Sequence, residues 1–378
     1  MGTDINRERD ARIDFFRGLA LLFIFIDHVP NNSWAHATLK NFGFSDASEV
    51  FVLLAGYSAA IAYGLSRDGF EASFRRAMRR AGEIYVWHIG VFIASAALLF
   101  AAAHYFNKPD YVDNVALRDL ITDPGRSLLS ALALVYQPNQ MNILPLYVVL
   151  MLWLPVVLLL LRQSVALALI VSFAIWAIAN ASGINLPANR QGEGWYFNPL
   201  AWQLLFTTGA AAAVLSQQHA TKVRRELLVL AAAYVVFAFL NAAPWIAITW
   251  LPNDPLLPPD LVGQVSKNYL SVWRYLHILA LAYLVASLVP ANSAWLKQPW
   301  AASIVTCGKH SLEIFALGTL LSFLGWIAMA ELGPSGFIEL LVNIAGMGAL
   351  GWAAWHLSQR KLQQRRSAAS APRRAESS

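Results

Sequence analysis

Charged residues are scarce in this sequence. Asp, Glu, Lys and Arg together make up 13% of its 378 residues, whereas soluble domains carry about 25%. Hydrophobic residues make up 57%, which is more apolar surface than a chain of this length can hide from water. The composition excludes a soluble enzyme, a nucleic-acid-binding protein and a disordered protein. It predicts an integral membrane protein.

Cysteine is almost absent as well. The only cysteine, Cys307, excludes an intramolecular disulfide and a metal cluster built on cysteine. No two histidines and a carboxylate stand at the spacing of a metal-binding motif, so we expect no metal ion. The polar–apolar alternation of an outer-membrane β-barrel is also missing. The apolar residues form continuous runs of about 20 residues, which is the length of a transmembrane helix, and they predict an all-α polytopic membrane protein.

The runs predict about ten transmembrane helices. They lie at residues 15–29, 48–64, 84–103, 143–161, 165–182, 199–216, 227–248, 270–289, 302–329 and 337–357. Residues 1–358 are therefore expected to form one transmembrane domain, and residues 359–378 a disordered, basic cytoplasmic tail. Residues 127–136 are apolar but too short to span, which favours an interfacial or re-entrant helix. Residues 104–126 are expected to form a solvated loop.

The basic residues indicate the orientation. If both termini lie inside, about three quarters of the 28 Lys and Arg residues fall in cytoplasmic segments, as the positive-inside rule requires. The net charge of +6 is then mostly a topology signal, and nucleic acid is not an expected partner. An alternative interpretation takes Arg7, Arg9 and Arg12 with the following apolar run as a cleaved secretory signal. Acidic residues within that basic segment weigh against it.

Two ionisable residues in the first predicted span point to function. Arg17 and His28 are separated by about three helical turns, so both lie on one helix face, ~16 Å apart along the axis. Arginine is permanently charged and suits phosphate or carboxylate, whereas histidine can accept a proton near neutral pH. One face thus carries an anion anchor at its inner end and a candidate general base at its outer end. The alternative is that Arg17 reaches lipid phosphates and His28 lies at the water interface.

The surrounding motifs resemble a known family. They are residues 12–20 (RIDFFRGLA) with His28 after them, residues 49–57 (EVFVLLAGY), residues 74–79 (FRRAMR) and residues 308–315 (GKHSLEIF). In this order they resemble the acyltransferase-3 membrane family, and more closely its OpgC branch, which modifies osmoregulated periplasmic glucans. Ala55 stands where the family usually has serine, so a role for that hydroxyl is not expected here.

The resemblance implies a reaction. An acyl group, succinyl in the OpgC branch, would pass from cytoplasmic acyl-CoA to a hydroxyl of a periplasmic glucan or related glycan. Acyl-CoA would be a cosubstrate, with no permanently bound cofactor. The expected partners are the lipid bilayer, acyl-CoA and the glycan acceptor, and the expected location is the bacterial inner membrane.

Site residues follow from this chemistry. His28 is the candidate base for the sugar hydroxyl, and Glu49 is expected to orient it. Arg17 is expected at the catalytic site and, together with Arg75, Arg76 and Arg79, at the CoA phosphates. Positive-inside topology alone would also explain the last three. Arg274 and His277, at the outer start of the eighth span, are expected to contact the acceptor or the acyl carboxylate, and ordinary interfacial pairing is the alternative. Trp195, Tyr196 and Trp273 near the outer mouth are candidates for stacking on sugar rings, and an aromatic belt is the alternative for them.

A transporter or flippase is the main rival. Such proteins also place charged residues beside a polar pathway. They usually contain broken helices in two related halves, and the sequence shows no such internal repeat. A catalytically inactive relative that acts as a scaffold is a weaker alternative.

Overall fold

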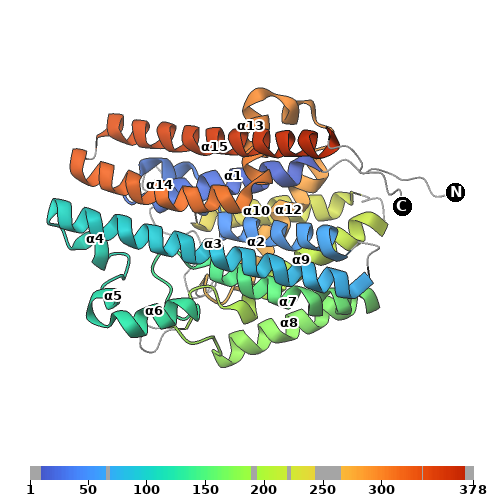
Figure 1. Cartoon of the computed structure of the whole chain (residues 1–378). Coiled ribbons are helices and arrows are strands. Elements are labelled where there is room, and N and C mark those ends of the chain that lie inside the picture. Colours follow the sequence, from blue (N-terminus) through green and yellow to red (C-terminus); the bar gives the residue numbers. More distant parts are fainter. Residues whose placement is uncertain are drawn as a thin grey trace, which may run out of the picture.

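The structure is a computed structural model that describes residues 10–64, 69–188, 194–218, 223–242, 265–333 and 335–370. Apart from one isolated bridge between Pro187 and Gly194, the described residues form helices and the turns that join them. The long helices run side by side in one bundle (Figure 1). The predicted all-α polytopic membrane fold is confirmed.

Within the described residues, ten long helices correspond to the ten predicted spans. They are α1 (Ala11–His28), α2 (Ala47–Ala59, continued by Ala60–Gly64), α3 (Gly69–Phe106), α7 (Ile143–Gln163), α8 (Val165–Ser182), α9 (Pro199–Gln218), α10 (Arg225–Ala242), α12 (Val272–Leu288), α14 (Ser311–Leu332) and α15 (Gly336–Ser370). Eight of them are long and apolar enough to cross a membrane. The other two are α12, which has 17 residues, and α1, which carries several charges. A span count of ten stays a prediction.

The helices differ in their position in the bundle. In the most apolar 18-residue stretch of α9, 67% of the residues are buried, whereas only 17% are buried in α8 and 11% in α10. The main core contains residues of α1, α2, α3, α7, α9 and α14, among them Phe25, Phe51, Ile84, Leu146 and Trp202. The exposed apolar faces of α8 and α10 are therefore the faces suited to lipid.

Small residues let the central helices approach closely. A Cβ on Gly18 of α1 would lie 2.0 Å from the Ile304 carbonyl oxygen of α13 (Pro299–Lys309), and one on Gly308 of α13 would lie 1.8 Å from that of Asp14. Gly56 of α2 and Gly209 of α9 make the equivalent crossing. Backbone contact of this kind is typical of membrane helix packing. These contacts fix the positions of α1, which carries Arg17 and His28, and of α2, which forms part of their surroundings.

Two predicted segments differ from expectation, and part of a third cannot be compared. The span predicted at 302–329 is two helices, α13 and α14, separated by His310. Residues 359–370 are helical and continue α15, because Gln, Lys, Arg and Ala are good helix formers; residues 371–378 lie outside the described residues. The rest of the predicted span at 227–248, beyond Ala242, also lies outside them.

The segment 104–126 is not simply a solvated loop. It folds into α4 (Asp110–Asp113) and α5 (Asp119–Thr122), and Tyr111, Val112 and Leu117 are buried against α3 and α14. Its apolar residues occupy one side, while Asp110 and Asp119 are exposed. The apolar segment 127–136 overlaps the short helix α6 (Pro124–Leu132). These three helices cluster at one end of the bundle (Figure 1).

Candidate active site

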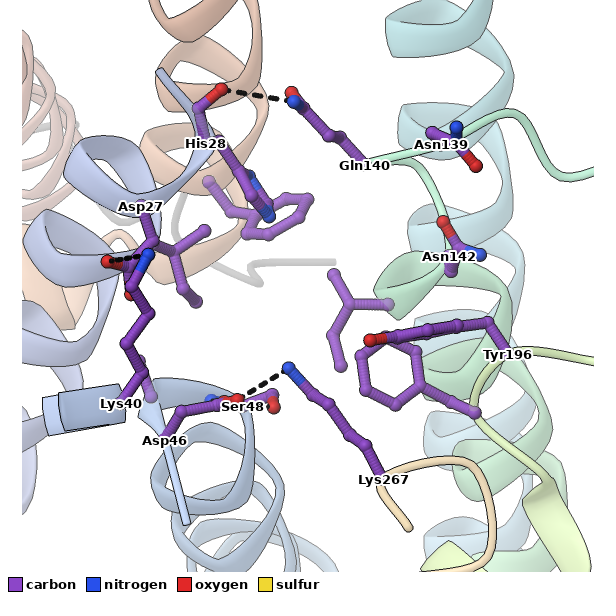
Figure 2. A pocket seen from close by; sticks show the side chains of 15 residues that line it. Asp27, His28, Lys40, Asp46, Ser48, Asn139, Gln140, Asn142, Tyr196 and Lys267 are labelled. Atoms are coloured by element: carbon purple, nitrogen blue, oxygen red, sulfur yellow. Dashed lines mark hydrogen bonds and ion pairs between the residues drawn. The ribbon is translucent and has the colours of Figure 1, made fainter. Parts of the chain in front are cut away.

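A cavity of about 380 Å³ opens at the end of the bundle where α1 ends, which we call the His28 end. It lies between the last turn of α1, the first turn of α2, the start of α7 and two loops (Figure 2). Its polar lining residues are Asp27, His28, Lys40, Asp46, Ser48, Asn139, Gln140, Asn142, Tyr196 and Lys267. The candidate base therefore lies in a pocket that is lined mostly by polar residues.

His28 has a ring nitrogen with no partner. Its Nδ1 is buried and accepts or donates no hydrogen bond among the described residues. The residue is held instead through its backbone, since the Gln140 Nε2 donates to the His28 carbonyl oxygen at 3.0 Å. The imidazole is thus positioned beside the cavity and is not engaged by a carboxylate.

Glu49 does not orient His28. Asp46 and Glu49 form a capping box at the start of α2, in which the Asp46 N–H donates to the Glu49 carboxylate at 2.8 Å. The other Glu49 oxygen accepts from the Arg274 Nε at 2.6 Å. The side chain is fully buried, and both of its oxygens are used in this way. The expected contact with His28 is therefore replaced by helix capping and an ion pair.

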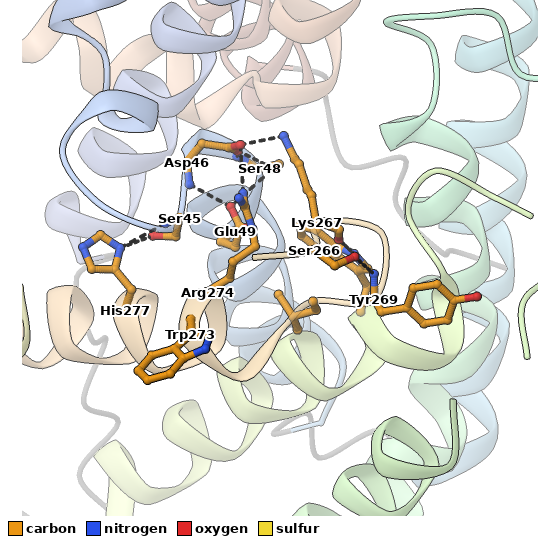
Figure 3. A network of polar contacts seen from close by, with 12 residues as sticks. Ser45, Asp46, Ser48, Glu49, Ser266, Lys267, Tyr269, Trp273, Arg274 and His277 are labelled. Carbon is orange, nitrogen blue, oxygen red and sulfur yellow. Dashed lines mark hydrogen bonds and ion pairs between the residues drawn. The ribbon is translucent and has the colours of Figure 1, made fainter. Parts of the chain in front are cut away.

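A buried charge network continues from this cap (Figure 3). Asp46 Oδ2 lies 2.6 Å from the Lys267 Nζ and 3.0 Å from the Arg274 Nη2. Burial alone would raise the Asp46 pKa, but the positive charges of Lys267 and Arg274 outweigh it and hold that pKa well below its usual value. Burial likewise opposes the charge on Lys267, yet Asp46 and Glu49 keep the Lys267 pKa raised. Asp46 and Lys267 are thus both ionised at neutral pH.

Arg274 and His277 do not line the pocket as the acceptor role would require. Arg274 is 9% exposed and pairs with the two acidic residues of the cap. His277 is fully buried, and its Nδ1 lies 2.7 Å from the Ser45 hydroxyl. Because both lie on α12 and contact the start of α2, they position the wall of the pocket.

The three aromatic residues predicted near the acceptor also differ in their surroundings. Trp195 is buried, with its Nε1 donating to the Pro187 carbonyl oxygen at 3.1 Å. Trp273 packs against Phe44 and Phe237. Tyr196 alone of the three lines the pocket, and it is 44% exposed.

Arg17 lies toward the opposite end of α1, which we call the Arg17 end. Its Nη2 donates to the Leu54 carbonyl oxygen at 2.9 Å and to the Ser58 hydroxyl, both in α2, and the Asp14 carboxylate is 3.9 Å away. The residue is only 7% exposed. Arg17 thus faces α2, the helix whose first turn borders the cavity beside His28.

The three other predicted donor residues lie on the first part of α3. Arg75 is exposed and its Nη1 is 3.7 Å from Glu71, four residues earlier on the same helix. Arg79 is exposed, and Arg76 is half-buried. Arg80, which the sequence analysis did not single out, pairs with Glu83 at 2.8 Å. Arg75 and Arg79 stand four residues apart on this helix and so share a face.

Sequence reasoning missed the other side of the pocket. Gln140 is 112 residues from His28 along the chain, and Lys267 is paired with Asp46 across 221 residues. No spacing rule connects them. One signal was available, namely the amide-rich run QPNQMN at residues 137–142 directly before an apolar helix.

Among the described residues, no group of three or more His, Cys, Asp and Glu side chains is placed to hold a metal ion.

Comparison with known proteins identifies the family. The profile described as OpgC protein matches residues 9–362. The chain belongs to the OpgC family. No curated protein and no solved structure matches this chain. The matched region includes every site residue discussed above, and membership of the OpgC family implies a multi-pass membrane acyltransferase.

Proposed function

We propose that this OpgC family member transfers an acyl group, succinyl, from cytoplasmic acyl-CoA to a hydroxyl of a periplasmic glucan. The bacterial inner membrane is its proposed location, with both termini in the cytoplasm and the His28 end outside. The observation that carries the proposal is the position of His28, which lines a cavity of about 380 Å³ together with nine other polar side chains. A sugar hydroxyl is a poor nucleophile, and a base held in such a cavity can activate it.

The reaction balances with His28 as a proton carrier. The imidazole takes the proton of the sugar hydroxyl as that oxygen attacks the thioester carbonyl carbon. The new C–O ester bond forms, the C–S bond breaks, and the CoA sulfur leaves with the electron pair. The proton on His28 then passes to that sulfur, so the products are the acylated sugar and free CoA.

The experiment that tests the proposal measures both products. Purified protein in detergent is supplied with succinyl-CoA and a neutral glucan, and mass spectrometry detects succinylated glucan while a thiol reagent detects free CoA. We expect the two products in equal amounts. A protein that forms neither, but moves glucan across the membrane of sealed vesicles, would support the transporter alternative.

The arginines of α3 are proposed to bind the CoA phosphates. Replacing Arg75, Arg76 and Arg79 together by lysine keeps the charge that sets topology but removes the planar fork that grips phosphate. We therefore expect the KM for succinyl-CoA to rise at least several-fold and the KM for glucan to stay constant. Steady-state kinetics with each substrate varied in turn measures this, and Arg360→Lys on the exposed part of α15 is the matched control. Unchanged kinetics for both substrates would leave these residues with a topological role only.

The proposed orientation predicts which cysteines can be labelled from outside. Asp119→Cys lies on α5 at the His28 end, and Gln217→Cys lies near the last residue of α9 at the Arg17 end; both positions are exposed. In intact spheroplasts, a membrane-impermeant maleimide should label the first variant and not the second. Cys307 is 2% exposed and should give little background. Labelling of both from the same side would show that the span count has the wrong parity.

A further inference from the structure

The wall of the pocket opposite Asp27 and Lys40 has no assigned role (Figure 2). It is made of Asn139, Gln140, Asn142 and Tyr196. We infer that these residues form a binding subsite for a neutral, polyhydroxylated sugar, which holds the acceptor hydroxyl against His28. The inference deepens the proposed function, on which it rests, by naming the residues that recognise the acceptor.

The charges of the pocket argue for a neutral ligand. Lys40 pairs with Asp27 at 3.2 Å, and Lys267 pairs with Asp46 at 2.6 Å. The two positive and two negative side chains that line the cavity therefore compensate one another. An anion would have to compete with an existing ion pair for either lysine, whereas a neutral ligand leaves both pairs intact.

The amide side chains have hydrogen-bonding capacity to spare. A carboxamide offers two N–H donors and an oxygen acceptor. The Gln140 Nε2 binds the His28 carbonyl oxygen, and the buried Oε1 has no partner in the described part of the chain. The Asn139 Nδ2 donates to the Asn114 carbonyl oxygen at 2.9 Å. Asn142 caps α7 by position, but its side chain makes no capping hydrogen bond. Groups that both donate and accept suit hydroxyls, which do the same.

The turn that presents these amides is built rigidly. Gln140 has a φ of 70°, in the left-handed region that residues other than glycine adopt rarely. Such a conformation persists only where the surroundings fix it, and it clusters at functional sites. The Asn139 N–H donates to the Val115 carbonyl oxygen at 3.0 Å, and the Tyr136 hydroxyl donates to that of Ala116 at 2.6 Å. The packed segment after α3 thus supports the turn from behind.

Tyr196 supplies the apolar part of the subsite. The residue is 44% exposed and lines the cavity, and the Lys267 Nζ lies 5.9 Å from the centroid of its ring. Sugars carry C–H groups on the faces of their rings, and an aromatic ring of this kind offers them a flat apolar surface together with a polar hydroxyl. With the amides beside it, this wall can bind both the edge and the face of a sugar ring.

The position of Gln140 connects the subsite to the reaction. Its Nε2 holds the backbone of His28, while its buried Oε1 has no hydrogen-bond partner among the described residues. A sugar hydroxyl bound by this turn is therefore placed next to the residue that carries the proposed base. Arg274 and His277, in contrast, lie behind the start of α2 and cannot fill this role.

Direct binding tests the subsite without relying on chemistry. Asn142→Ala removes an amide that makes no capping bond, and Tyr196→Leu removes the ring while keeping an apolar side chain. Titration calorimetry of the whole protein in detergent, with a neutral β-linked glucohexaose as the probe, should show Kd at least tenfold higher for each variant. Gln217→Ala and Tyr105→Leu, at exposed positions outside the pocket, are the matched controls and should bind like the unmodified protein.

Kinetics and competition complete the test. The variants should raise the KM for glucan about as much as they raise Kd, and the KM for succinyl-CoA should stay constant. Unchanged glucan binding in both variants would overturn the subsite even if the protein acylates glucan normally. Displacement of the glucohexaose by free succinate would also overturn it, since the wall would then bind the acyl carboxylate. Glucan binding that depends on Asn142 and Tyr196 without any acyl transfer would instead reject the proposed function and keep the subsite.

Discussion

His28→Ala is expected to lower kcat for acyl transfer by two or more decades. General-base catalysis by a positioned side chain contributes ~10²–10⁴ to a rate, and within the described residues that line the cavity His28 is the only imidazole. Its Nδ1 makes no hydrogen bond to any described residue, so removing the side chain breaks no polar contact of that atom with the described part of the chain. The KM values should therefore change little, and the variant should fold.

Three measurements separate a catalytic from a structural loss. Initial rates of CoA release give kcat, a thermal-shift curve in detergent reports folding, and added imidazole should partly restore the rate of His28→Ala. His104→Ala changes an exposed histidine on α3, at the same end of the bundle, and should retain full activity. A folded His28→Ala protein with near-normal turnover would reject His28 as the base.

The sequence predicted the helices and one end of the site because those signals are local. A transmembrane helix follows from a continuous apolar run, and the shared face of Arg17 and His28 follows from helical geometry alone. The contacts of Arg17 with Leu54 and Ser58 place it on the side that faces α2. Both conclusions depend on neighbours within one segment, which a single sequence contains.

The other side of the site depends on contacts between distant segments. Gln140 reaches His28 only because the segment around Val115 holds its turn in place, and no periodicity records that arrangement. Glu49 is a different case, since a signal was present and was not used. Asp46 and Glu49 stand at the spacing of a capping box, which predicts that the glutamate reaches back to the start of its own helix. Its position at the outer start of the second predicted span suggested a partner for His28, but its geometry is that of a helix cap.

Arg274→Ala is expected to destabilise the protein by about 3–5 kcal/mol. The Arg274 Nε donates to Glu49 at 2.6 Å, and Glu49 is fully buried. Removing one partner of a buried ion pair leaves the other charge without compensation, which costs about this much. Asp46 keeps Lys267, so the main loss falls on Glu49. Unfolding in detergent, followed by circular dichroism, should show a clearly lower Tm than that of the unmodified protein.

A second substitution distinguishes this role from acceptor binding. In the double variant Arg274→Met with Glu49→Gln, the glutamine can still accept the Asp46 N–H of the capping box, and no unpaired charge remains. Replacing both members of a buried pair by neutral groups is often close to neutral in stability, so the double variant should recover most of the lost Tm. An acceptor ligand would behave differently, because its loss would raise the KM for glucan and leave Tm unchanged, and adding Glu49→Gln would not restore that KM. A normal Tm with a raised KM for glucan in Arg274→Ala would therefore return Arg274 to the acceptor site. A lowered Tm with an unchanged KM would instead identify it as a positioning residue. In that role it holds the start of α2, and with it Asp46 and Ser48, against the cavity beside His28.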